Sequence, residues 1–255
     1  MSAPQPSDPS LGALSTLWTI VRHAGGDQTG IAARQELCRR YHGAVERYLR
    51  AAVRDPAVAA ELAQEFAVKL LQGDLAGASP DRGRFRDYVK GVLRHQLADY
   101  YRRPKREIQG PNDAPEPAGP ADGLAALDRE WVRGWRKELL NRAWAALDEF
   151  QARTGQPVAD VLRFRVDHQD LRSPELAEQL GPRLGRTITA DWVRQAIHRA
   201  RERFGEFLLA EIADTISNPT AESLAEELAD LELLQYCQAA LVTWQSKQPK
   251  PQAGD

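Results

Sequence analysis

Cysteine is scarce in this sequence, which has two, Cys38 and Cys237, far apart and without a CxxC pair. This usage argues against structural disulfides and zinc sites, and it favours a reducing compartment. The N-terminus has no basic start followed by an apolar run, and no stretch approaches about eighteen uninterrupted apolar residues. We therefore expect a cytoplasmic location, with neither a signal peptide nor a membrane span.

Motifs of catalysis are missing as well. The sequence has no HExxH pair, no glycine-rich phosphate loop and no GxSxG turn, and its five histidines are scattered. Strand signals are also absent, because no hairpin turn separates runs of alternating β-branched residues. We expect a helical protein that is not an enzyme and that binds no cofactor or metal.

Apolar residues recur at helical spacing along almost the whole chain. The first four stripes lie at residues 14–21, 37–49, 58–70 and 85–100, and later stripes follow at 124–135, 158–162 and 193–208. Pro104 ends the fourth helix, because proline lacks a backbone N–H and clashes with the preceding turn. The pattern predicts an all-α fold.

A segment rich in glycine and proline interrupts this pattern at residues 107–123, which is typical of a linker. We predict two small helical domains joined by this linker, at residues 1–106 and 124–212. Residues 213–255 are predicted to be an acidic helical extension.

A helix-turn-helix is predicted in the second domain. Ser173 and Pro174 mark the start of a short helix that stops at Gly181, and Thr189 can cap the next helix. Opposite the apolar stripe of that next helix lie side chains suited to DNA bases and phosphates: Arg194, Gln195, His198, Arg199 and Arg201. An ordinary amphipathic helix with a solvated basic face would show the same pattern, so both interpretations are open.

Charge is segregated along the chain, although the net charge is only −2. Residues 81–106 carry nine Lys or Arg against three Asp, residues 183–203 carry six Arg against two acids, and residues 206–232 carry eight acids and no Lys or Arg. In the first segment Arg86, Lys90 and Arg94 repeat every four residues, and tyrosines alternate with the cations. Charge that follows the backbone, combined with aromatic platforms, is typical of single-stranded DNA binding, although most of the aromatics also suit a helical core.

A third feature is AELAQEF at residues 60–66, where Glu61, Gln64 and Glu65 lie opposite Leu62 and Phe66. By itself it is a plain amphipathic helix, and docking of a protein partner on the polar face is the alternative.

Taken in order, these segments resemble the sigma-factor family, in its minimal two-domain, extracytoplasmic-function branch. AAELAQEFAVKLL resembles the helix that binds core RNA polymerase, and RFRDYVKGVLRHQLADYYRR resembles the helices that melt and read the −10 element. SPELAEQLG and TADWVRQAIHRARERF resemble the domain that reads the −35 element. The turn PRLGRTI is longer than the family's usual turn, and the extension lies outside the family's minimal pattern.

The resemblance implies a role in promoter recognition and DNA melting, with core RNA polymerase and promoter DNA as partners. It assigns polymerase binding to Glu61, Gln64 and Glu65, and the −35 element to Arg194, Gln195, His198, Arg199 and Arg201. It assigns the −10 element to Arg86, Lys90, Arg94, His95, Gln96, Tyr101, Arg102, Arg103, Lys105 and Arg106. A regulatory partner, such as an anti-sigma protein, is compatible with this role, and the sequence does not identify one.

Two other classes of protein fit parts of the pattern. A one-component helix-turn-helix regulator would bind duplex DNA without polymerase, whereas a helical adaptor would leave both basic segments unexplained. The acidic extension has two interpretations as well: a stabilising cap on the second domain, or a regulatory element that covers the basic DNA-reading face.

Overall fold

The computed structural model describes residues 28–53, 55–72, 84–102 and 122–247, and this part of the chain is built from helices without a strand. The predicted all-α fold is confirmed. The helices are α2 (Gln28–Ala52), α3 (Pro56–Gln72), α4 (Phe85–Arg102), α5 (Asp122–Thr154), α6 (Val158–Asp167), α7 (Ser173–Arg183), α8 (Ala190–Ala213), α9 (Ala221–Asp230) and α10 (Leu234–Lys247). The expected helix at residues 14–21 and nearly all of the linker lie outside the described residues.

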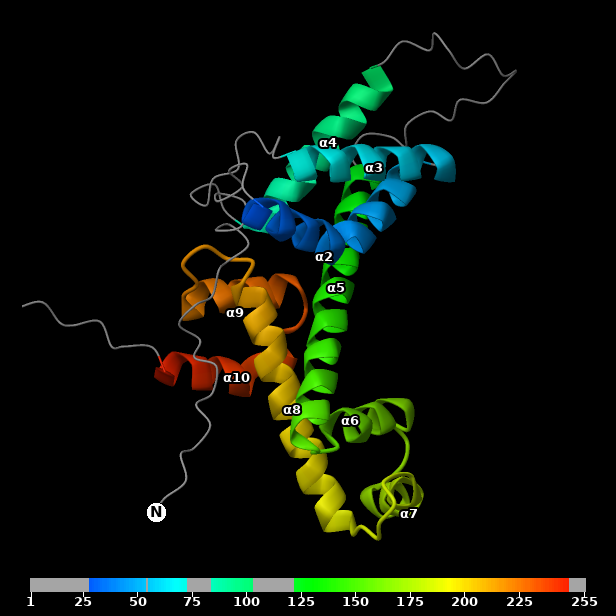
Figure 1. Ribbon diagram of the computed structural model, residues 1–255, viewed down its shortest axis with the longest axis vertical. Coiled ribbons are helices and arrows are strands. Elements are labelled where there is room, and N and C mark those ends of the chain that lie inside the picture. The colour runs from blue at the N-terminus through cyan, green and yellow to red at the C-terminus, as the bar shows by residue number, and fades with distance from the viewer. Residues whose placement is uncertain (1–27, 54, 73–83, 103–121, 248–255) are drawn as a thin grey trace, which may run out of the picture.

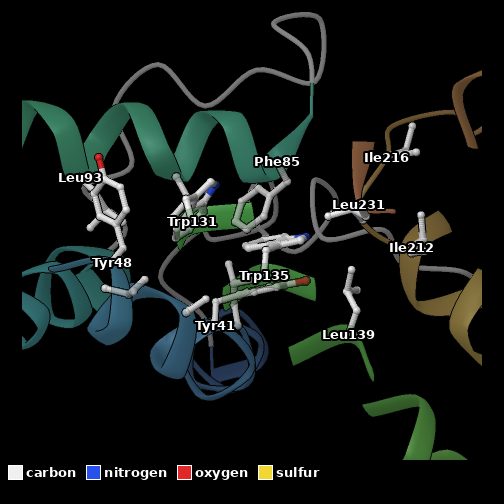
Figure 2. Packing of buried hydrophobic residues seen from close by; sticks show 14 of the residues in the cluster. Tyr41, Tyr48, Phe85, Leu93, Trp131, Trp135, Leu139, Ile212, Ile216 and Leu231 are labelled. Carbon is white, nitrogen blue, oxygen red and sulfur yellow. The ribbon is translucent and has the colours of Figure 1, made fainter. Parts of the chain in front are cut away.

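Helices α2, α3 and α4 form a bundle at one end of the molecule, and the first half of α5 completes it (Figure 1). Trp131 and Trp135 of α5 are fully buried in this bundle. Trp135 stacks on Tyr41 of α2 with ring centroids 4.1 Å apart and planes at 6°. Figure 2 shows the two stacked rings close to Phe85 of α4. The predicted apolar stripes of α2, α3 and α4 therefore meet in a core that a distant helix closes.

The long helices α5 and α8 run side by side away from this bundle and carry α6 and α7 at their far end (Figure 1). Trp144 of α5 packs on Phe204 of α8 with centroids 4.9 Å apart, and Arg142 Nε donates to Glu211 Oε2 at 2.6 Å. A separate small core joins α6, α7 and the start of α8. Helix α7 and the start of α8, where the helix-turn-helix is predicted, thus lie at the end of a two-helix stem.

The start of α7 and the turn after it differ from expectation by a few residues. Arg172, not Ser173, is the N-cap, and its backbone N–H donates to Glu175 Oε2 at 2.6 Å. The helix continues past Gly181 to Arg183, and the turn closes at Gly185, whose φ of 65° lies in the left-handed region that glycine adopts without strain. Thr189 caps α8 as predicted, because its Oγ1 accepts the Trp192 N–H at 3.2 Å.

The C-terminal extension folds as α9 and α10, which pack against the second half of α8. Leu224 and Leu228 of α9 and Leu231, directly after this helix, are fully buried. Gly205 of α8 allows close packing of α10, because a Cβ at this position would lie 2.9 Å from the Tyr236 carbonyl oxygen. The main buried cluster runs from α2 through α5 and α8 to α10, so the packing is continuous across the two predicted domains.

Within the described part of the chain, no helix is both long enough and apolar enough to cross a membrane.

Candidate nucleic-acid interface

Helix α8, the second helix of the predicted helix-turn-helix, presents its predicted DNA-reading side chains to solvent. The buried side of α8 is formed here by Val193, Ala196 and Ala200. On the opposite side all five candidates are exposed: Arg194, Gln195, His198, Arg199 and Arg201. This arrangement is the one that a recognition helix needs, with an apolar face that holds it in place and a polar face free to enter a groove.

Two acids share this exposed face of α8. Arg194 pairs with Asp191 one turn earlier, and His198 Nε2 lies 3.3 Å from Glu202 Oε1. Both pairs are exposed, so they are weak in water and can exchange for contacts to DNA.

The other arginines of the basic segment at 183–203 support the fold. The guanidinium of Arg183 lies 4.7 Å from the centre of the Phe164 ring, and that of Arg186 lies 4.4 Å from the centre of the Trp192 ring. Arg203 Nη1 donates to Glu206 Oε2 at 2.8 Å. The charge excess seen in the sequence thus divides between structural cations and the exposed face of α8.

The cationic stripe of α4 faces carboxylates from other helices. Arg86 is buried and pairs with acids of α9. Arg94 Nη2 lies 2.6 Å from Asp128 Oδ1 of α5, and Lys90 Nζ lies 3.9 Å from the same oxygen. The regular spacing of these three cations in the sequence therefore corresponds to contacts within the folded chain.

Gln96 is also turned inward. Its Nε2 donates to the Leu62 carbonyl oxygen at 2.9 Å and to Glu65 Oε2 at 3.2 Å, which fastens α4 to α3. His95, next to it in the chain, is exposed and lies 3.6 Å from Asp99 Oδ2.

The exposed candidates of α4 gather toward its C-terminal end. Tyr101 is 53 % exposed, and its hydroxyl donates to the Ala52 carbonyl oxygen at 2.9 Å, which leaves the ring at the surface. Arg102 is exposed beside it and pairs with Asp99 at 3.3 Å. The chain continues from here into Arg103, Lys105 and Arg106, which lie outside the described residues.

The polar face of α3 combines carboxylates, an amide and apolar side chains. Glu61 and Gln64 are exposed, and Glu65 is half-buried where it accepts the Gln96 hydrogen bond. Val68 is 44 % exposed on the same face of the helix. The sequence pattern does not indicate this exposed residue as part of a binding surface, because Val68 lies outside the regular apolar stripe. An exposed apolar residue next to acidic ones suits a protein partner better than it suits DNA.

An ionic cluster joins α2, α5 and the C-terminal end of α8 through Arg40, Arg142, Glu211 and Asp214. Desolvation by burial raises the pKa of Asp214 from 3.8 to about 6, and the nearby Glu211 carboxylate adds to this effect. Arg40 and Arg142 face the same carboxyl group and oppose the shift of its pKa. Burial also raises the pKa of the Tyr41 hydroxyl above its usual value, in spite of the nearby Arg142 guanidinium.

Comparison with known proteins identifies the first bundle. Residues 37–107 match the family Sigma-70 region 2. The match covers most of α2 and all of α3 and α4, the helices that carry the candidate polymerase-binding and −10 residues. No curated protein and no solved structure gives a significant match to the chain. Residues 37–107 thus resemble sigma-70 region 2, and this match supports a sigma-70-type sigma factor involved in transcription initiation.

Proposed function

We propose that this chain is a sigma factor of the extracytoplasmic-function type, which directs core RNA polymerase to promoters with particular −35 and −10 elements and promotes their melting. The exposed polar face of α8 is the observation that supports recognition of a particular −35 element. Region 2 by itself supports only the general binding of core polymerase and promoter DNA. Promoter DNA and core polymerase are the partners in this proposal, and the cytoplasm is its location. An anti-sigma protein would be a further partner.

The −35 element is read by α8 in this proposal. Arg194 and Arg199 are exposed, and an arginine can donate two hydrogen bonds to guanine in the major groove. Gln195 can pair in the same way with adenine, and Arg201 reaches toward the phosphates. A bidentate pair of this kind contributes about 1–3 kcal/mol of discrimination against the wrong base.

The −10 element is held by the C-terminal end of α4 and the basic residues that follow. Opening duplex DNA costs about 1.4 kcal/mol per base-pair step in stacking. A protein that melts DNA without ATP recovers this cost by binding the opened strand, through aromatic stacking of about 1–3 kcal/mol per base and through phosphate neutralisation. Tyr101 offers an exposed ring, and His95 and Arg102 offer exposed polar groups on the same helix.

Core polymerase docks on α3 in this proposal. Glu61 and Gln64 are free of the region 2 core, and Val68 supplies exposed apolar area at the same face. The carboxylates suit a basic surface on the polymerase.

Run-off transcription with core polymerase on a library of promoter sequences tests the proposal. We expect a transcript set with shared −35 and −10 sequences, and we expect Arg199→Ala to relax selection at particular −35 bases. A chain that supports no specific transcript, but that binds duplex DNA tightly by itself, would instead be a one-component helix-turn-helix regulator.

A further inference from the structure

The C-terminal extension meets the first turn of α4 through a network of ion pairs. Arg86 Nε lies 2.7 Å from Glu227 Oε1, and the two side chains are only 6 % and 1 % exposed. Arg86 Nη2 lies 3.0 Å from Asp230 Oδ2. Arg84 Nη1 lies 2.8 Å from Glu227 Oε2 and also pairs with Asp230. Two cations of region 2 thus share two carboxylates of α9.

Apolar and backbone contacts reinforce these ion pairs. Leu228 of α9 and Leu231, directly after this helix, belong to the same buried cluster as Phe85, the first residue of α4. Figure 2 shows Leu231 in this cluster together with Phe85 and Trp135. The Phe85 N–H, at the start of α4, points to the Thr215 carbonyl oxygen at 3.5 Å. The acidic segment therefore lies against region 2, and the expectation that it could cover the DNA-reading face of α8 is wrong for the described residues, because that face is exposed.

We infer that the C-terminal extension is a docking partner of region 2 within the same chain, and that Arg84 and Arg86 serve this contact and not the DNA backbone. The part of the inference that concerns DNA rests on the proposed function, whereas the contact between α4 and α9 does not.

Burial is the physical reason for this assignment. A phosphate contact needs an accessible guanidinium. Arg86 becomes accessible only if α9 leaves its place and exposes its two buried leucines, Leu224 and Leu228. Glu227 would then lose the two cations that compensate its buried charge. Arg102 at the other end of α4 is already exposed, so DNA reaches it without any rearrangement.

The contact is tested first by thermal unfolding of the full chain. Arg86→Gln and Glu227→Gln should each lower the unfolding midpoint by about 6–20 °C, because each takes a partner away from a buried charge. The double variant should lose less than the sum of the two, since it removes both charges together. Glu222→Gln, at an exposed position of the same helix, is the matched control and should change the midpoint by less than about 2 °C.

The role of the arginines is tested by the salt dependence of binding to a single-stranded −10 oligonucleotide, measured with the holoenzyme. Each phosphate contact contributes about 0.7 to the slope of log affinity against log salt for single strands. Arg84→Gln should leave this slope unchanged, whereas Arg102→Gln should lower it. If Arg102→Gln also left the slope unchanged, the proposed −10 surface would fail while the unfolding result for α4 and α9 would stand.

Two results would overturn the inference. One is a loss of slope in Arg84→Gln similar to that expected for Arg102→Gln, because Arg84 would then bind a phosphate. The other is a gain in DNA affinity in Glu227→Gln or Asp230→Asn at low salt without any drop in the unfolding midpoint, because α9 would then be a displaceable cover over a DNA site.

Discussion

Trp135 offers the sharpest test of how region 2 is completed in this chain. The indole is fully buried and stacks on Tyr41, although it belongs to α5, beyond residues 37–107 that match region 2. Truncation of a buried tryptophan to alanine costs about 3–5 kcal/mol, and the stacked ring contact is part of that loss. With a shift of about 2–4 °C per kcal/mol for a chain of this size class, Trp135→Ala should lower the unfolding midpoint by about 6–20 °C.

Two control variants separate this effect from general damage. Trp135→Phe keeps an aromatic ring against Tyr41 and removes an indole N–H that has no acceptor among the described residues, so it should cost less than half as much. Trp192→Ala makes the same truncation at a half-buried site in the first turn of α8. Only Trp135→Ala should weaken binding to core polymerase, measured by competition with a labelled sigma factor. A midpoint within about 2 °C of the wild type, with unchanged polymerase affinity, would show that α5 is not part of the region 2 core.

Three further predictions concern single side chains. Glu61→Lys should weaken binding to core polymerase several-fold, and more at low salt than at high salt, which a titration at two ionic strengths would detect. Arg199→Ala should cost about 1–3 kcal/mol at particular −35 base pairs and little at others, as measured by transcription from single-substitution promoters. The raised pKa of Asp214 contributes to the free energy of unfolding below about pH 4, and this contribution is lost as pH rises through about 6. Asp214→Asn should therefore stabilise the protein above pH 6 and make its stability depend less on pH. The shift in the pKa of Asp214 corresponds to about 3 kcal/mol in the free energy of unfolding. Urea unfolding of both proteins at pH 4.5 and pH 7.5 measures this difference.

The elements of the fold could be predicted from local patterns in the sequence. The stripe at residues 37–49 identifies the buried face of α2, and Thr189 identifies the start of α8, because both signals act within one or two helical turns. The exposed face of α8 follows from the same periodicity. Such short-range signals do not reveal which helix covers a given apolar stripe, and so Trp131 and Trp135 were assigned to the second domain although they pack against α2.

The partners of charged residues could not be predicted for the same reason. Arg86 and Arg94 repeat every four residues like a stripe that tracks DNA, but their carboxylates lie at Asp230 and Asp128, far away in the sequence. Gln96 has a partner more than thirty residues away, at the Leu62 carbonyl oxygen, and only the packing of α4 on α3 brings it there. The sequence shows how many cations a segment carries. Whether those cations can bind DNA depends on the acids that distant helices bring next to them.

The continuous buried cluster from Leu37 to Leu241 has a consequence for how the protein is made. A ribosome adds about 5–20 residues per second, so about 10–40 seconds pass between synthesis of α2 and synthesis of α10. During that time region 2 lacks first the indoles of α5 and then the leucines and carboxylates of α9. A nascent or C-terminally shortened chain would therefore hold an incomplete bundle around α2, α3 and α4, with apolar side chains exposed to water that the later helices cover in the full chain.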